Sequence, residues 1–212
     1  SGFGVLDLGF AFNGYNVLEA YDHWRPAFDN HNKNKSLLKA TAYQRSLALS
    51  DNEIALESLP KADVVLGGPP CQGFSLAGRR NENDERNKLV DSYVDFISLI
   101  KPKILFFENV NGFTIGFKKM GKRGEPYSDN VSKKLEDLGY KVHFDIVDFS
   151  EFGIPQRRKR FILVGVLEGK PEAFFEKIVE AKVGFLKSKG LKENITLGEA
   201  ISDLESKHGK VN

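Results

Sequence analysis

Residues 63–75 read DVVLGGPPCQGFS and contain the only cysteine of the chain, Cys71. The apolar run after Asp63 is typical of a buried strand, and the two prolines hold the following backbone extended. We therefore expect Cys71 on a stiff loop at a strand end, where a thiol can act as a nucleophile. The alternative is a buried structural cysteine, but the glycines and prolines around it make a poor core environment.

Composition restricts the other possibilities. A lone cysteine cannot form an intramolecular disulfide, and with four histidines it does not favour a zinc site, so we expect no metal. The 212 residues are 41% hydrophobic, enough for one domain with a small appendage. We find no signal peptide, no apolar run that could span a membrane and no repeat, and we expect a cytoplasmic protein without membrane contact. The net charge of +2 requires local positive charge for any nucleic-acid binding.

The first 22 residues contain a glycine-rich segment, SGFGVLDLGF, followed by an apolar strand at 15–22 that ends in an acid. In nucleotide-binding α/β folds, an acid at the end of the second strand accepts the ribose hydroxyls. Asp22 is our candidate, and Glu19 is the alternative, although alternation places Glu19 within the strand. His23 or Trp24 could cover an adenine ring, and Trp24 could equally be a core residue.

Two later segments supply charged residues. The run ILFF at 104–107 is typical of a strand buried on both faces of a parallel sheet, and Glu108 follows at its carboxyl end, where α/β sheets bind ligands; a structural capping acid is the alternative. Residues 152–160 read FGIPQRRKR and lead into an apolar strand at 161–166. Strand alternation would place Gln156, Arg158 and Arg160 on one face, whereas general phosphate contact is the alternative for these cations.

These motifs, in this order, resemble the cytosine carbon-5 DNA methyltransferases over residues 1–167. The resemblance implies an α/β fold, a Rossmann-like S-adenosylmethionine-dependent methyltransferase sheet with helices on both faces. It implies that Cys71 attacks the cytosine ring and that Glu108 grips the ring nitrogen and exocyclic amine. Arg158 and Arg160, in the Gln-x-Arg-x-Arg pattern that begins at Gln156, would hold the cytosine oxygen and brace the site.

The same resemblance assigns the cofactor and DNA contacts. S-adenosylmethionine, which becomes S-adenosylhomocysteine, would be held by a set that also includes an acid near the adenine; Asp51 is the candidate, although it could equally cap a helix at 52–58. Double-stranded DNA would be contacted partly from the polar loop at 76–87, which we expect to act as a lid. The cofactor set is Gly2, Gly4, Asp22, His23, Trp24, Asp51, Pro69 and Leu89, and the DNA set is Ser75, Asn109, Arg79 and Arg80.

Two departures from the family pattern concern the ends of the chain. No strand precedes the glycine loop, so the first strand of the sheet is missing, and no target-recognition domain follows. We expect a catalytic core at 1–167 and a peripheral segment at 168–212, where residues 196–204 resemble the helix that leads to that domain. The chain would then be part of a larger enzyme or one subunit of a split enzyme. The basic run at 118–123 is expected to be simply solvated.

The function implied by the resemblance is DNA (cytosine-5-)-methyltransferase activity on a flipped-out cytosine, through a covalent cysteine adduct, in a restriction-modification context. Such an enzyme is cytoplasmic, and nucleoid-associated in a bacterium. One alternative is a tRNA cytosine carbon-5 methyltransferase, although the Gln-Gly-Phe-Ser continuation after Cys71 is closer to the DNA enzymes. The other is a non-catalytic DNA-binding fragment that needs a partner.

Overall fold

The computed structural model describes residues 2, 4–46, 59–70, 88–119 and 122–204. Within these ranges the chain alternates helices and strands, as an α/β protein does. In chain order the elements are α1 (Val5–Phe12), β1 (Glu19–Asp22), α2 (Arg25–Lys33), α3 (Lys35–Leu38), β2 (Thr41–Gln44), β3 (Val64–Gly67), α4 (Lys88–Ile100), β4 (Ile104–Val110), η4 (Asn111–Thr114), β5 (Lys118–Lys119), β6 (Lys122–Arg123), α5 (Tyr127–Asp137), β7 (Lys141–Asp148), η5 (Phe149–Phe152), β8 (Lys159–Val166), α6 (Glu172–Ser188), α7 (Leu197–Ile201) and η6 (Ser202–Leu204).

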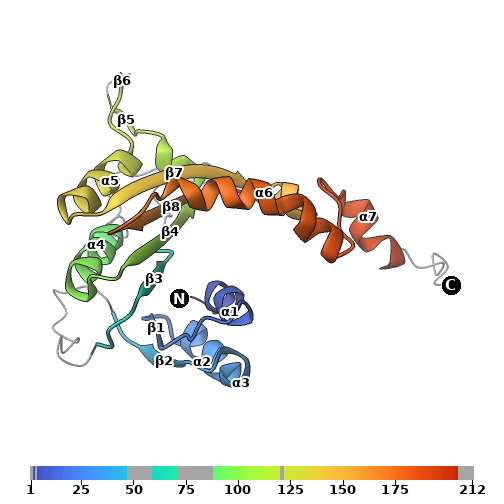
Figure 1. Cartoon of the computed structure of the whole chain (residues 1–212), viewed down its shortest axis with the longest axis horizontal. Helices are drawn as coiled ribbons and strands as arrows, with labels where there is room; N and C mark the ends of the chain where they lie inside the picture. Colours follow the sequence, from blue (N-terminus) through green and yellow to red (C-terminus); the bar gives the residue numbers. More distant parts are fainter. Residues whose placement is uncertain (1, 3, 47–58, 71–87, 120–121, 205–212) are drawn as a thin grey trace.

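The main sheet has four strands in the order β3-β4-β8-β7 (Figure 1). β3 is parallel to β4, and β8 runs antiparallel to both β4 and β7. The parallel sheet expected around residues 104–107 is therefore present on one side of β4 only. On the other side β8, which comes last in the chain, is inserted between β4 and β7.

Strand alternation divides the main sheet into two apolar faces. One face carries Leu105, Phe107, Phe161 and Leu163 and packs against buried residues of α4 and α5. The other carries Ile162, Val164 and Val166 and packs against the start of α6. Helices thus cover both faces, as predicted, and α6 continues past the sheet toward the C-terminus (Figure 1).

A smaller unit comprises α1, β1, α2, α3 and β2. Its two strands are parallel, with Glu19 opposite Thr41, and among the described residues they share no ladder with the main sheet. Its buried apolar residues are mostly small: Ala20, Ala27, Leu38, Ala40 and Ala42. Two aromatic contacts connect it to the main unit, Tyr21 with Phe96 and Phe10 with Phe106, each with ring centroids 6.1 Å apart.

Several predicted boundaries need correction. The strand expected at 15–22 begins only at Glu19. The sequence predicts a helix at about 128–138 with Ser128 as its cap and Gly139 as its stop. The helix begins instead at Tyr127, with Pro126 at the cap position. Ser128 is buried, and its hydroxyl donates to the Asp129 carboxylate rather than accepting a helix N-terminal amide. The predicted end of that helix is confirmed, because Gly139 follows with a φ of 93°.

The sequence also predicts a core helix, ended by Pro102, whose apolar residues recur at helical spacing: Leu89, Tyr93, Phe96, Ile97 and Ile100. This prediction is confirmed by α4, since Tyr93, Phe96 and Ile97 are buried and the helix ends two residues before Pro102. The helix predicted at 52–58 lies outside the described residues. No helix in the described ranges is both long enough and apolar enough to cross a membrane.

Candidate active site at the carboxyl end of the main sheet

Glu108 and Arg160 form the ion pair at the centre of the candidate site. They lie on neighbouring strands, because the β4–β8 ladder places Val110 opposite Arg160 and Glu108 opposite Ile162. The Arg160 Nε donates to Glu108 Oε1 at 2.8 Å, and the two side chains are 19% and 33% exposed. A second nitrogen of the guanidinium donates to the Lys159 carbonyl at 2.9 Å. The Glu108 carboxylate is therefore oriented but still accessible to a ligand.

The backbone that leads to Cys71 passes beside this pair. A Cβ placed on Gly68 would lie 3.4 Å from Glu108 Oε2, so the chain three residues before Cys71 is next to the carboxylate. Gly67, the residue before Gly68, packs against Tyr93: a Cβ at Gly67 would meet the Tyr93 ring at 2.1 Å, so only glycine fits there. Tyr93 is in turn fixed by a hydrogen bond from its hydroxyl to the Phe106 carbonyl at 3.2 Å, and burial raises the pKa of that hydroxyl.

Gln156 and Arg158 are not brought to Glu108 among the described contacts. The prediction that they alternate with Arg160 along a strand is wrong, because β8 begins only at Lys159. The preceding residues form a tight bend in which the Gln156 amide donates to the Ile154 carbonyl at 2.7 Å, and Pro155 has no N–H for a ladder. Both side chains are exposed, without a hydrogen bond to another described residue.

The other residues predicted near the base have different surroundings. Asn109 is 1% exposed within β4, and its Oδ1 accepts the Val110 amide at 2.8 Å, so it lies beneath the site rather than on a DNA-facing surface. Pro69 and Leu89 are partly buried at the end of β3 and the start of α4. The predicted residues that lie outside the described ranges are Cys71, Ser75, Arg79, Arg80 and Asp51.

The glycine loop is closed by Asp22 at the end of β1. The Gly2 amide donates to Asp22 Oδ2 and the Trp24 amide to Asp22 Oδ1, both at 2.9 Å. Gly2 and Gly4 have φ values of 59° and 80°, which favour glycine, and the space beside Gly2 is open. Glu19, the alternative acid, instead accepts the Tyr21 hydroxyl. Asp22 is therefore the acid that contacts the loop.

His23 and Trp24 extend outward from this point. The His23 ring nitrogen Nδ1 lies 3.8 Å from Asp22 Oδ1, and its side chain is 71% exposed. Trp24 is 52% exposed, so it is not a core residue. Both rings are accessible to a ligand held at Asp22.

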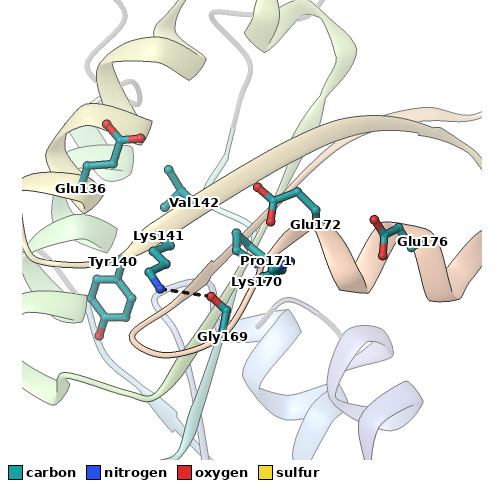
Figure 2. Close-up of a pocket in the computed structure, with 9 residues that line it drawn as sticks. All are labelled: Glu136, Tyr140, Lys141, Val142, Gly169, Lys170, Pro171, Glu172 and Glu176. Atoms are coloured by element: carbon teal, nitrogen blue, oxygen red, sulfur yellow. Dashed lines mark hydrogen bonds between the residues drawn. The ribbon is translucent and has the colours of Figure 1, made fainter.

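A cavity of about 710 Å³ lies elsewhere (Figure 2). It is lined by residues from the end of α5, the start of β7 and the start of α6, and Lys141 donates across it to the Gly169 carbonyl at 3.4 Å. Lys141 is opposite Val166, which is opposite Ile104 at the amino end of β4. The cavity is therefore at the other end of the sheet from Glu108. The described ranges contain no group of three or more His, Cys, Asp or Glu that could hold a metal.

Comparisons with known proteins support the predicted family. Residues 1–211 match the family model of the C-5 cytosine-specific DNA methylases. The Type II methyltransferase M.FnuDI of Fusobacterium nucleatum is 34% identical over 166 residues, 78% of this chain and 44% of that protein. The Type II methyltransferase M.DdeI of Desulfomicrobium norvegicum is 32% identical over 208 residues, 96% and 46% of the two chains.

The fold is also shared with a solved structure. The Dnmt2 methyltransferase of S. pombe superposes with a TM-score of 0.60 and 19% identity, covering 84% of this chain and 52% of that one. The chain spans about half the length of the curated relatives named above. From the ordered motifs, the α/β architecture and the match over nearly its whole length, we conclude that this chain belongs to the C-5 cytosine-specific DNA methylase family.

Proposed function

We propose that this chain carries the catalytic part of a DNA (cytosine-5-)-methyltransferase in a restriction-modification context. Family membership and Type II relatives support this. The observation that carries it is the Glu108–Arg160 pair at 2.8 Å, beside the backbone of Gly68 and at the strand end that leads to Cys71. The carboxylate and the guanidinium, with a thiol three residues after Gly68 in the sequence, are the groups needed to activate a pyrimidine ring.

The proposed chemistry uses this chain's residues in sequence. The target cytosine leaves the duplex, because a stacked base exposes neither face to a thiolate, at a cost of about a few kcal/mol. Cys71 adds as the thiolate to ring carbon 6, forming a C–S bond. Glu108 shares a proton with the ring nitrogen and stabilises the charge that enters the ring. Arg160 fixes the carboxylate through its planar fork of donors. After carbon 5 is methylated, loss of its proton restores the ring and expels the thiolate.

The residues at the glycine loop fit S-adenosylmethionine, which supplies an electrophilic methyl group. The Asp22 carboxylate, next to the open side of Gly2, would accept the ribose hydroxyls, and the exposed rings of His23 and Trp24 would cover the adenine. Both oxygens of Asp22 accept backbone amides, which fixes the orientation of the carboxylate.

Cys71→Ala tests the proposed reaction. With the rest of the enzyme supplied, the wild type should transfer labelled methyl groups to duplex DNA and form a covalent adduct with 5-fluorocytosine DNA, whereas Cys71→Ala should do neither and still bind S-adenosylmethionine. An adduct retained in Cys71→Ala would remove this thiol from the mechanism. Transfer to tRNA in preference to DNA would support the tRNA methyltransferase alternative, and an inactive wild type that binds DNA would support the non-catalytic one.

We also infer that sequence recognition resides in a second subunit or a further recognition domain. Glu108, Arg160 and Cys71 are assigned to the flipped base, and Asn109 is buried, so the described residues offer no evident set of side chains to read neighbouring base edges. The chain alone should bind duplex DNA weakly, without sequence preference and with strong salt dependence. Competition binding against random DNA tests this, and tight discrimination of one short site at physiological salt would contradict it.

A further inference from the structure

Asp7 and His31 form a buried polar pair behind the glycine loop. Asp7 lies in α1 and His31 in the last turn of α2, and the two residues are 6% and 0% exposed. The His31 Nε2 lies 3.2 Å from Asp7 Oδ2, within hydrogen-bonding distance. This contact joins two helices whose residues are 24 positions apart in the chain. It is remote in sequence from every group assigned to the cytosine.

The His31 ring also packs against the glycine loop at Gly4. A Cβ placed on Gly4 would meet His31 Cδ2 at 2.7 Å, Leu38 Cδ1 at 3.0 Å and His31 Nε2 at 3.3 Å. Gly4 is at the cap position of α1 with a φ of 80°, and no side chain caps this helix. The turn conformation at Gly4 therefore depends on the position of the imidazole ring.

The same loop is also held by Asp22. The Gly2 amide donates to Asp22 Oδ2 at 2.9 Å, whereas Gly4 lies against His31, the residue that pairs with Asp7. Asp22 faces the ligand in the proposed function, and Asp7 acts from behind through His31. A shift of the imidazole would move Gly4 and, through the loop, the amide that contacts Asp22.

The pair is poorly explained by stability alone. The second ring nitrogen of His31, Nδ1, is buried without a hydrogen-bond partner among the described residues. A buried polar group with an unmet hydrogen bond destabilises a fold, and well-packed apolar residues of the same volume are often at least as stable. The hydrogen bond to Asp7 does, however, fix the orientation of the ring.

We propose that Asp7 and His31 are positioning residues that hold the Gly2–Gly4 loop in the conformation that binds S-adenosylmethionine; this rests on the proposed function. Removing the hydrogen bond, by Asp7→Ala or by the ring-preserving His31→Phe, should raise the Kd for S-adenosylmethionine about tenfold. Asp7→Asn should stay close to wild type, because the amide oxygen still accepts a hydrogen bond from Nε2–H.

The experiment is calorimetry on the 212-residue chain, with Val131→Ala as the matched control. Val131 is fully buried in α5, away from the loop, so its truncation lowers stability without touching Asp7 or His31. A weaker Kd in Asp7→Ala and His31→Phe, restored in Asp7→Asn and absent in Val131→Ala at a similar loss of Tm, supports positioning. Equal weakening in Val131→Ala overturns it, because any destabilisation would then suffice.

Hydrogen exchange of residues 4–12 without cofactor separates this proposal from the proposed function. If the wild type does not bind S-adenosylmethionine even with the rest of the enzyme supplied, the proposed function fails, and exchange still tests the pair. Faster exchange confined to this segment in Asp7→Ala supports positioning of the loop. Unchanged exchange in the segment, or an equal increase across the whole chain, overturns it.

Discussion

The two units of the molecule are built on different kinds of core. The main sheet buries large aromatic and branched residues, among them Phe107, Phe113 and Phe161, whose rings pack within about 6 Å of one another. The smaller unit buries mainly alanines and a polar pair, Asp7 with His31. The proposed base-binding groups are thus supported by a core of large, closely packed side chains. The glycine loop is supported by a smaller core that depends on hydrogen bonds. Chemistry that needs fixed geometry is placed where packing is strongest.

Phe107→Ala should have the largest effect on stability. Phe107 is fully buried and lies 5.2 Å from the Tyr93 ring centroid and 5.4 Å from that of Phe113. Removing the ring leaves a cavity that should lower the free energy of unfolding by about 3–5 kcal/mol, measured by urea denaturation. Phe12→Ala, at a 70% exposed position, should change it by less than about 0.5 kcal/mol. A loss below about 1 kcal/mol for Phe107→Ala would contradict the central position of this ring cluster.

Leu38→Ala should have a smaller and more local effect. Leu38 is the one large apolar side chain among the buried apolar residues described in the smaller unit, and we expect a loss of about 2–3 kcal/mol. Hydrogen exchange should show faster opening within residues 5–44 and little change in β4 and β8. If both units open together, the two cores are one cooperative structure and the distinction between them fails.

Asp22→Ala tests the function of the smaller unit rather than its packing. It removes the acceptor of the Gly2 and Trp24 amides and the proposed ribose contact, and should weaken S-adenosylmethionine binding by about 1–3 kcal/mol in calorimetry. Glu19→Ala is the matched control, since Glu19 bonds to Tyr21 and not to the loop. If Asp22→Ala binds S-adenosylmethionine as tightly as the wild type, another residue must contact the ribose.

The smallest expected effect is a change with pH in how much Ser150→Ala, in the main unit, lowers the free energy of unfolding. The Ser150 hydroxyl and amide donate to Asp148 Oδ1 at 2.8 and 3.1 Å, and these bonds lower the pKa of Asp148 from its ordinary value of 3.8. A lowered pKa stabilises the fold above pH 3.8, and the effect is lost as the pH falls through the lowered value. The difference in unfolding free energy between wild type and Ser150→Ala should therefore shrink in acid.

Ser188→Ala provides the comparison for that pH series. The Ser188 hydroxyl donates to the Phe185 carbonyl at 2.8 Å and is exposed, so no carboxylate is involved. Its effect on unfolding should be independent of pH. A Ser150→Ala difference that stays constant between pH 6 and pH 3 would show that Asp148 does not titrate in the way its bonds imply.

Local patterns predicted most of the main unit. The apolar runs that became β3, β4 and β8 and the stripe that became α4 were each bounded by glycine, proline or charge, and these signals are carried by neighbouring residues. The position of β8 between β4 and β7 was not predictable, because strand order depends on packing between residues far apart in the chain, such as Leu105 and Gly165. The alternation predicted from Gln156 to Arg160 was wrong because the bend at Pro155 delays the start of β8 until Lys159.

The candidate site was predictable to the extent that it lies at strand ends. Glu108 and Asp22 lie at the carboxyl ends of β4 and β1, and Arg160 is the second residue of β8, so a motif and a strand end are enough to find them. Asp7 and His31 were missed, since a buried polar pair between two helices gives no periodic signal. The weak indication was an acid inside the otherwise apolar segment VLDLGFAF. Gly67 was visible as a glycine, but its contact with Tyr93 required the packing of α4.

The separation of the two sheets has a consequence for the protein in concentrated solution. Among the described residues, β3 pairs only with β4 and shares no ladder with the β1–β2 pair, so β3 is an edge strand of the main sheet. Such edges can recruit a strand from another molecule, which leads to self-association and aggregation. β3 is only four residues long, and the Asp63 carboxylate before it is paired with Lys103 at 2.7 Å, so a short strand flanked by charged groups limits such pairing. Because the chain has a net charge of +2 at pH 7 and an isoelectric point of about 8.5, buffers well below pH 8 at low salt should keep the molecules charged, mutually repulsive and dispersed.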